Sequence, residues 1–254
     1  MFGRTYYHEI LRNTIIAFGT LFNDIHIVRT DAGGTTQQSM KVPLAYGPKQ
    51  KFLARLREDA NVDRKVAVSL PRIGFEMGGI EYDGTRKLNK MIKTRKVKGT
   101  KGTQVDTQFS PVPYNVSFEL FVMAKNSDDG VQIVEQIIPY FQPDYSITIN
   151  AVPSMDIIRD IPIVLLSTGY EDTYDGDFMT RRALIYTFSF SAKTYMYGPV
   201  VTSSIIKKVD VDQYADLKEK APPRVRQYSV SGVETSTAEE DDNFGFTETL
   251  SEWV

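Results

Sequence analysis

Residues 114–124 read YNVSFELFVMA, a stretch in which large apolar side chains occur on both alternating sets of positions. One set contains Val116, Phe118, Leu120 and Val122, and the other contains Ser117, Glu119, Phe121 and Met123. Successive residues of a strand point to opposite faces of the sheet, and a strand that is covered on both faces is apolar on each. The pattern therefore predicts a central β-strand with other elements packed on both sides.

The stretch that follows predicts a helix that ends at a proline and is followed by a strand. Side-chain oxygens of Ser127 to Asp129 lie where the free amides of a helix start need acceptors, so Asp128 and Asp129 are interpreted as caps and not as an acid pair. The expected buried stripe consists of Val131, Val134, Ile137 and Ile138, and the residues expected to face out are Gln132, Glu135 and Gln136. Pro139 and Pro143 should end the helix, because proline lacks the amide donor.

Further segments complete an outline of the fold. Helical spacing predicts one helix over residues 5–22 and another that begins at Pro48, with Phe52, Leu53 and Leu56 on one side. The strands predicted from their composition and alternation are 25–29, 41–46, 66–82, 157–168 and the half-exposed 180–197, with an acidic hairpin tip at 169–178. No regular βαβ rhythm is present, so we predict the α+β class, with a mixed, mainly antiparallel sheet packed with helices.

The sequence offers little for catalysis or metal binding. It has no cysteine and only two histidines, His8 and His26, which removes disulfides and thiolate zinc sites and lowers the expectation of an enzyme. No phosphate-binding loop of the Walker type is present. The acidic residues Asp172, Asp175 and Asp177 lack the closing glutamate of a calcium-binding EF-hand. We therefore expect no catalytic residue, no metal and no cofactor.

Two sequence signals predict where the chain is used. There is no run of eighteen apolar residues, so no membrane span is expected. The N-terminus lacks the charged start and cleavage site of a signal peptide, so a cytoplasmic protein is expected.

The net charge of −2 conceals two oppositely charged segments. Residues 86–102 contain eight basic and no acidic side chains, and residues 234–254 contain seven acidic and no basic ones. The basic segment lies between the extended stretches 66–82 and 103–109, which predicts a long projecting β-hairpin with a basic tip, the alternative being a solvated loop. Its candidate contact residues are Arg86, Lys87, Lys90, Lys93, Arg95, Lys96, Lys98 and Lys101.

Those cations could serve three purposes. They could neutralise DNA phosphates without reading sequence, since the segment has no aromatic residue for base stacking. They could instead meet an acidic protein surface, or simply be solvated. The sequence leaves these alternatives open.

The chain changes character after residue 200. We predict a domain over 1–200, an extension over 201–221 with a short strand and helix, and an extended acidic tail over 222–254. Residues 221–227 read as a linker, and 229–243 have a disordered composition. Phe246, Leu250, Trp253 and Val254 fall at i, i+4, i+7 and i+8, which predicts a two-turn helix. With Phe244 they form a candidate docking peptide for another subunit, the alternative being that the tail folds back on its own body.

Several blocks of the chain, in this order, resemble the tail sheath stabiliser and tail completion proteins of T-even-like contractile-tail bacteriophages. The most specific block is SPVPYNVSFELFVMAKNSDDGVQIVEQIIPYFQP at 110–143. The supporting blocks are the MFG start, KVPLAYGPKQKF at 41–52, LPRI at 70–73, RDIPIVLLS at 159–167, DGDFMTRR at 175–182 and YMYGPV at 195–200. The resemblance extends from residue 1 to about residue 200 and does not cover the acidic tail.

This resemblance implies a structural virion protein without an active site. It implies a ring-forming tail terminator, a hexamer, that caps the head-proximal end of the sheath and tube. The implied partners are the tail sheath protein, the tail tube or tube terminator, the neck proteins, and DNA that passes through the lumen without specific readout. The implied location is the virion tail or neck, after assembly in the host cytoplasm. The alternative is a sequence-independent DNA-binding protein that acts through residues 86–102.

Overall fold

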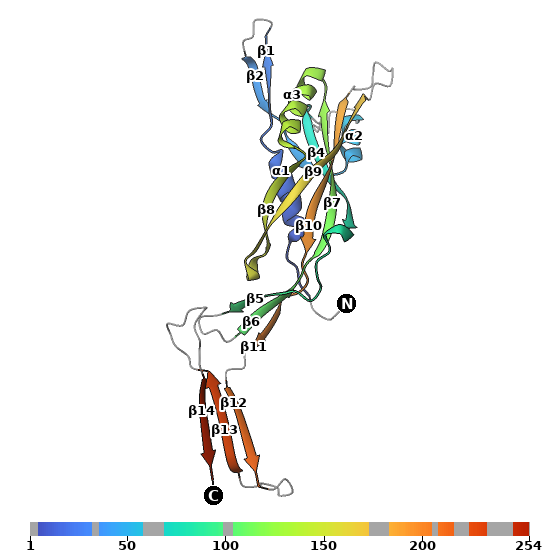
Figure 1. Ribbon diagram of the computed structural model, residues 1–254. Coiled ribbons are helices and arrows are strands. Elements are labelled where there is room, and N and C mark those ends of the chain that lie inside the picture. Colours follow the sequence, from blue (N-terminus) through green and yellow to red (C-terminus); the bar gives the residue numbers. More distant parts are fainter. Residues whose placement is uncertain are drawn as a thin grey trace. The chain divides into compact units, whose positions relative to one another are not determined.

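The computed structural model describes residues 5–31, 36–57, 69–98, 104–172, 183–204, 208–215, 224–232 and 246–253 (Figure 1). The chain divides into two compact units. The first unit comprises residues 1–94 and 108–200, and the second comprises residues 95–107 and 201–254. The functional division predicted at residues 200 and 221 stays a prediction.

A six-stranded sheet forms the frame of the first unit. Its order is β3 (Leu44–Tyr46), β4 (Arg72–Tyr82), β7 (Val112–Ala124), β10 (Leu184–Met196), β9 (Ile157–Asp172) and β8 (Asp144–Val152). The β3–β4 pair is parallel and the other pairs are antiparallel. The predicted mixed, mainly antiparallel sheet with helices is therefore confirmed, although strands predominate over the three α-helices that the described residues form.

Strand β7 lies in the interior of this sheet, between β4 and β10, as its sequence predicts. One face presents Val116, Phe118, Leu120 and Val122, all fully buried in the main core. On its other face, Phe121 and Met123 are buried in a second, smaller core. Apolar residues on both faces thus indicated a central strand correctly.

Helix α1 (Ile10–Leu21) packs on the main-core face of the sheet through Phe18. The Phe18 ring is fully buried and stacks on Phe118 with a centroid distance of 4.4 Å. It also contacts Phe75 at 5.4 Å and Phe190 at 5.3 Å, so three strands meet at one side chain. The helix begins later than the predicted residue 5, because Glu9 adopts the left-handed conformation with a φ of 57°.

Helix α2 (Lys49–Arg57) covers the smaller core on the opposite face of the sheet. Phe52 is buried and contacts Phe121, with their ring centroids 5.4 Å apart. Leu53 packs beside this core. The predicted second helix after Pro48 is therefore confirmed, and the side chain of Leu56 lies outside the described set.

Helix α3 (Ser127–Ile137) is present, and two residues of the predicted stripe are as expected, since Ile137 is buried and Val134 packs against the main core, but the rest of its buried face differs. The buried residues are Asp129, Gly130, Ile133 and Ile137, whereas Val131 and Ile138 are 41% and 42% exposed. The reason is that α3 approaches the sheet at Gly130, where an added Cβ would lie 2.6 Å from the Tyr186 ring. The predicted cap at Asp129 is also wrong, because its carboxylate binds Arg29.

The predicted stop of α3 is confirmed. A 3-10 turn, η2 (Ile138–Tyr140), contains Pro139 and ends the helix, and β8 follows Pro143. Another such turn, η3 (Pro153–Met155), joins β8 to β9.

Strands β1 (His26–Thr30) and β2 (Thr36–Lys41) form an antiparallel two-stranded sheet. The strand predicted over 41–46 is interrupted, since Pro43 separates β2 from β3. Strands β9 and β10 pair as predicted, and one face of β10 carries the buried Phe188, Phe190 and Ala192. The acidic tip between them lies largely outside the described residues.

The predicted long hairpin with arms 66–82 and 103–109 is wrong. Residues 66–68 of the first arm lie outside the described set, and the rest of the arm forms β4 from Arg72 onward, which pairs with β3 and β7. The second arm is β6 (Gln104–Phe109), which lies between β5 (Lys93–Lys98) and β11 (Val201–Ser204) in a three-stranded sheet. The basic segment thus supplies a strand of its own, and a projecting hairpin is not confirmed.

The second unit ends in another three-stranded sheet, of β12 (Lys208–Tyr214), β13 (Arg224–Gly232) and β14 (Phe246–Glu252). The linker predicted over 221–227 and the disordered composition predicted from residue 229 are wrong for the part that forms β13. The C-terminal helix is also wrong, because residues 246–252 form a strand. Residues that are four positions apart lie on one face of a helix and also on one face of a strand. The spacing of Phe246 and Leu250 is therefore compatible with both structures. A free extended tail is not confirmed.

No helix in the described part of the chain combines the length and apolar character needed to cross a membrane.

Replacement of Phe18 by alanine should lower the free energy of unfolding by about 3–5 kcal/mol, because the cavity would face three strands. Denaturant unfolding measures this quantity. The matched control is Ile16→Ala on the same helix, whose side chain is 55% exposed and whose loss should change stability by less than about 0.5 kcal/mol. Equal losses in the two variants would show that α1 does not depend on Phe18.

Candidate functional site

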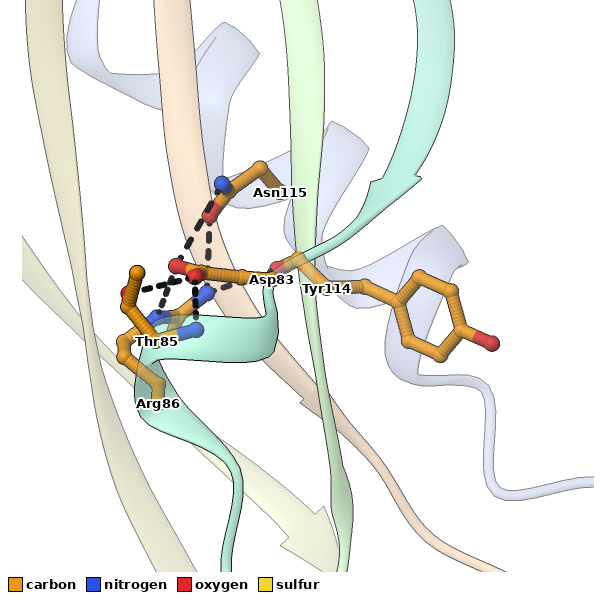
Figure 2. A network of polar contacts seen from close by, with 5 residues as sticks. All are labelled: Asp83, Thr85, Arg86, Tyr114 and Asn115. Atoms are coloured by element: carbon orange, nitrogen blue, oxygen red, sulfur yellow. Dashed lines mark hydrogen bonds and ion pairs between the residues drawn. The ribbon is translucent and has the colours of Figure 1, made fainter.

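The first cation of the basic segment, Arg86, is part of a polar network next to the short turn η1 (Gly84–Arg86) (Figure 2). Its Nε donates to Asp83 Oδ2 at 2.7 Å, and the same guanidinium donates to Asn115 Oδ1 at 2.7 Å and to the Tyr114 carbonyl at 3.2 Å. The guanidinium also lies 5.1 Å from the centre of the Tyr195 ring. Arg86 therefore joins η1 to β7 through hydrogen bonds within the chain.

Asp83 accepts from several donors in this network. Besides Arg86, the backbone amide and the hydroxyl of Thr85 donate to its Oδ1, at 3.0 and 2.6 Å. These hydrogen bonds, that of Arg86 above all, hold the pKa of the Asp83 carboxyl well below its usual range. The network thus favours an ionised Asp83.

The remaining basic residues lie on different elements. Lys87 and Lys90 precede β5, Lys93, Arg95, Lys96 and Lys98 lie on β5, and Lys101 lies outside the described residues. The Lys93 ammonium lies 4.9 Å from the centre of the Phe109 ring. The Lys98 ammonium is 3.8 Å from the carboxylate of the buried Asp106. The segment is therefore divided between a turn and a strand.

Exposed apolar residues accompany these cations, a feature that the charge analysis missed. Met91 is 77% exposed, Ile92 56% and Phe109 46%. Two hydrogen bonds hold this turn: the Ser110 amide donates to the Ile92 carbonyl at 3.0 Å, and its hydroxyl donates to the Asn89 carbonyl at 2.7 Å. The sequence KLNKMIK, in which lysines alternate with apolar residues, could have indicated these exposed apolar residues. Exposed apolar groups next to cations are typical of a protein-binding surface.

The C-terminal candidates are placed on a strand. Phe246 and Leu250 lie on one face of β14 and are 65% and 56% exposed. Trp253 follows β14, where its amide donates to the Val225 carbonyl at 2.9 Å and its ring lies 5.4 Å from the Arg224 guanidinium. Phe244 and Val254 lie outside the described residues. The tryptophan thus contacts its own sheet, whereas the side chains of Phe246 and Leu250 remain exposed.

A second polar cluster, which the sequence did not reveal, connects α3 to β1. The Arg29 guanidinium donates to both oxygens of Asp129, at 2.7 and 3.3 Å. This hydrogen bond, more than the charge of Asp129, raises the pKa of Arg29. One turn further along, the Gln132 amide donates to the Val28 carbonyl and accepts from the Val28 amide, both at 3.0 Å. Gln136 donates to the His26 carbonyl at 2.8 Å.

These contacts cover the outer edge of β1. Asp129, Gln132 and Gln136 lie at i, i+3 and i+7, which places them along one side of α3. Glutamine side chains satisfy backbone groups that an edge strand would otherwise leave unpaired. The cluster therefore fixes the β1–β2 hairpin to the frame of the first unit.

A groove of about 610 Å³ lies beside this hairpin, between the end of α1 and the turn after α3. Its walls include Phe22, Phe141 and Tyr145, with the carboxylates of Asp24 and Glu135 at the rim. Tyr140, also in its lining, is 68% exposed.

Within the described residues, no group of three or more histidine or acidic side chains is arranged to hold a metal ion. His8 has its Nε2 2.7 Å from the Gly198 carbonyl, and His26 has its Nδ1 3.2 Å from the Asp24 carbonyl. Of the aspartates weighed for calcium, Asp175 and Asp177 lie outside the described set.

A β-sheet frame whose turns are held by partly exposed polar clusters, and whose strands and turns carry exposed apolar residues, is typical of the class of structural assembly proteins. Comparison with known proteins identifies the family. Residues 5–254 match the T4-like virus Myoviridae tail sheath stabiliser family, so the chain belongs to this family of phage tail structural proteins. The chain is also 32% identical, over 227 residues, to tail completion protein gp15 of Enterobacteria phage T4, covering 86% of this chain and 82% of that protein.

The expected family is thereby confirmed, and the match includes the region after residue 200 that the resemblance did not cover. The chain is a structural component of a phage tail. Its relatives are structural tail proteins and not enzymes.

Replacement of Asp83 by asparagine should flatten the acid dependence of stability. The stabilisation from the ionised carboxylate is complete above the ordinary aspartate pKa of about 3.9, and it is lost as pH falls from there toward the lower pKa of the folded state. The melting temperature of Asp83→Asn should therefore fall less between about pH 5 and about pH 3 than that of the natural protein. The control is Asp144→Asn, at the exposed start of β8, which should keep the natural profile. Identical profiles for all three proteins would contradict the assignment.

Replacement of Arg29 by glutamine should cost about 1–3 kcal/mol in unfolding free energy, because the Asp129 side chain, only 4% exposed, loses its cation. Amide hydrogen exchange in β1 should also become faster. The control is Lys41→Gln on the same hairpin, whose exposed pair with Asp24 should contribute less than about 1 kcal/mol. If both variants behave alike, the Arg29–Asp129 pair does not hold the hairpin.

Proposed function

We propose that this chain forms a hexameric ring at the head-proximal end of a contractile tail. The ring covers the last ring of sheath subunits, contacts the tail tube or its terminator, and joins the tail to the neck proteins. It is assembled in the host cytoplasm and remains in the virion. DNA passes through its lumen without specific readout.

The family match over residues 5–254 is the observation that carries this proposal. The family description names stabilisation of the sheath, and the T4 relative is named for completion of the tail. Taken together, these two roles describe a protein that is added when the sheath has reached its full length and that prevents its loss.

The architecture of the first unit supports such a role. Helices on both faces of the sheet make a rigid frame, and the arginine and glutamine clusters hold a turn and a hairpin against it. Several exposed apolar residues of this unit remain outside the cores, including Met91 and Tyr140. Exposed apolar side chains do not stabilise an isolated subunit, whereas their burial in an interface stabilises an assembly.

Contact with passing DNA requires only cations in a lumen. Lys87, Lys90 and Lys93 are exposed and suit this requirement. DNA binding as the main activity would need the whole segment 86–102 to act together. That alternative is weakened because Arg86 is held in its own network and Lys98 lies near Asp106.

Loss of the chain should leave heads and tails unjoined. A phage with a nonsense mutation in this gene should yield filled heads and separate tails with unstable sheaths in electron micrographs, because the sheath end is uncovered. Supply of the natural chain in trans is the control, and it should restore joined particles that carry antibody label at the collar. Normal infectious particles in the absence of the chain would refute the proposal.

A further inference from the structure

Strands β5 and β14 are two of the four edge strands of the three-stranded sheets, and in the described part of the chain their outer sides are unpaired. Strand β5 is the last strand in the order β11-β6-β5, and β14 is the last in the order β12-β13-β14. An edge strand presents a row of free backbone donors and acceptors that can pair with another strand. Among the described residues, these two edges do not pair with one another.

Strand β5 has the sequence KTRKVK, with Lys93, Arg95, Lys96 and Lys98 and no acidic residue. Its apolar residue, Val97, is 59% exposed. Like charges that face one another across two strands are destabilising, so a second β5 is a poor partner for this edge. An acidic strand with an apolar face does not have this disadvantage.

Strand β14 has the complementary composition. Its sequence FTETLSE contains Glu248 and Glu252 and no basic residue, and both glutamates lie on the same face as the exposed Phe246 and Leu250. Glu252 pairs with Arg226, and Glu248 accepts from the Tyr228 hydroxyl. Each carboxylate has further acceptor positions for a cation.

One antiparallel register satisfies both strands at once. With Arg95 opposite Glu248, Val97 falls opposite Phe246 and Lys93 falls opposite Leu250. The oppositely charged pair Arg95–Glu248 and the apolar pair Val97–Phe246 then face one another directly, as in stable cross-strand pairs, and the aliphatic stem of Lys93 lies opposite Leu250.

We propose that β14 of one subunit pairs with the outer edge of β5 in a neighbouring subunit, so that two three-stranded sheets become continuous across the interface. The partner is a second copy of this chain, since the two complementary edges occur on the same sequence. The inference rests on the proposed function in one respect, namely that several copies lie side by side.

The absence of cysteine from the natural chain allows a direct test. Val97→Cys and Phe246→Cys are made as separate variants with different epitope tags, mixed in equal amounts, and treated with a short bismaleimide. The test is made on the purified protein and on tails assembled with both variants. The expected product is a dimer that carries both tags. The matched controls are Ser203→Cys in β11 and Val211→Cys in β12, both exposed residues outside β5 and β14, and they should give at least about tenfold less product.

Charge reversal supplies an independent readout. Arg95→Glu or Glu248→Lys should each reduce the cross-linked dimer by about tenfold, since like charges would then face one another. The two reversals in one chain should restore it. Restoration would not follow if each substitution only disturbed folding.

The outcomes separate this inference from the proposed ring. A native mass of six subunits without the Val97–Phe246 product, or with equal product from the controls, overturns the strand pairing and leaves the ring intact. A monomeric mass in solution and no ring in tails overturns both. A cross-link found only within single chains of a Val97→Cys/Phe246→Cys double variant also overturns the pairing between subunits.

Discussion

The contact of the Phe18 ring with Phe75, Phe118 and Phe190 is the interaction on which the first unit depends. It places one helix across three strands that are distant in sequence. Phe22, one turn later, extends the cluster to Phe141, so the segment after α3 is positioned by the same contacts. The groove between α1 and that segment exists because these aromatic rings fix both of its walls.

Polar clusters hold two further segments of the first unit in place. A two-stranded hairpin is at best marginally stable alone, and β1–β2 is held by side chains of α3 that replace a third strand. The Asp83–Arg86–Asn115 network does the same for the turn that follows β4. Rigid placement of such segments is what an assembly protein requires, since a partner binds more tightly to a surface that is already ordered.

The structure places the basic and the acidic segments of the chain on particular elements. Arg86 is part of the framework, the lysines near Met91 belong to an exposed turn, and the later cations form an edge strand. The C-terminal acidic residues include those of another edge strand. In the described part of the chain, the basic segment is thus divided among a polar network, an exposed turn and an edge strand.

The sequence by itself determined the central strand, the helices after Pro48 and Asn126, and the family, because apolar periodicity, proline positions and collinear blocks are local properties. It could not decide which face of α3 is buried, since that depended on the fit of Gly130 against Tyr186. It also assigned β14 to a helix, because Phe246 and Leu250 are compatible with both periods. The partners of Arg86 and Asp129 were hidden for a different reason: Asn115 and Arg29 are 29 and 100 residues away, and only tertiary packing brings such groups within hydrogen-bonding distance.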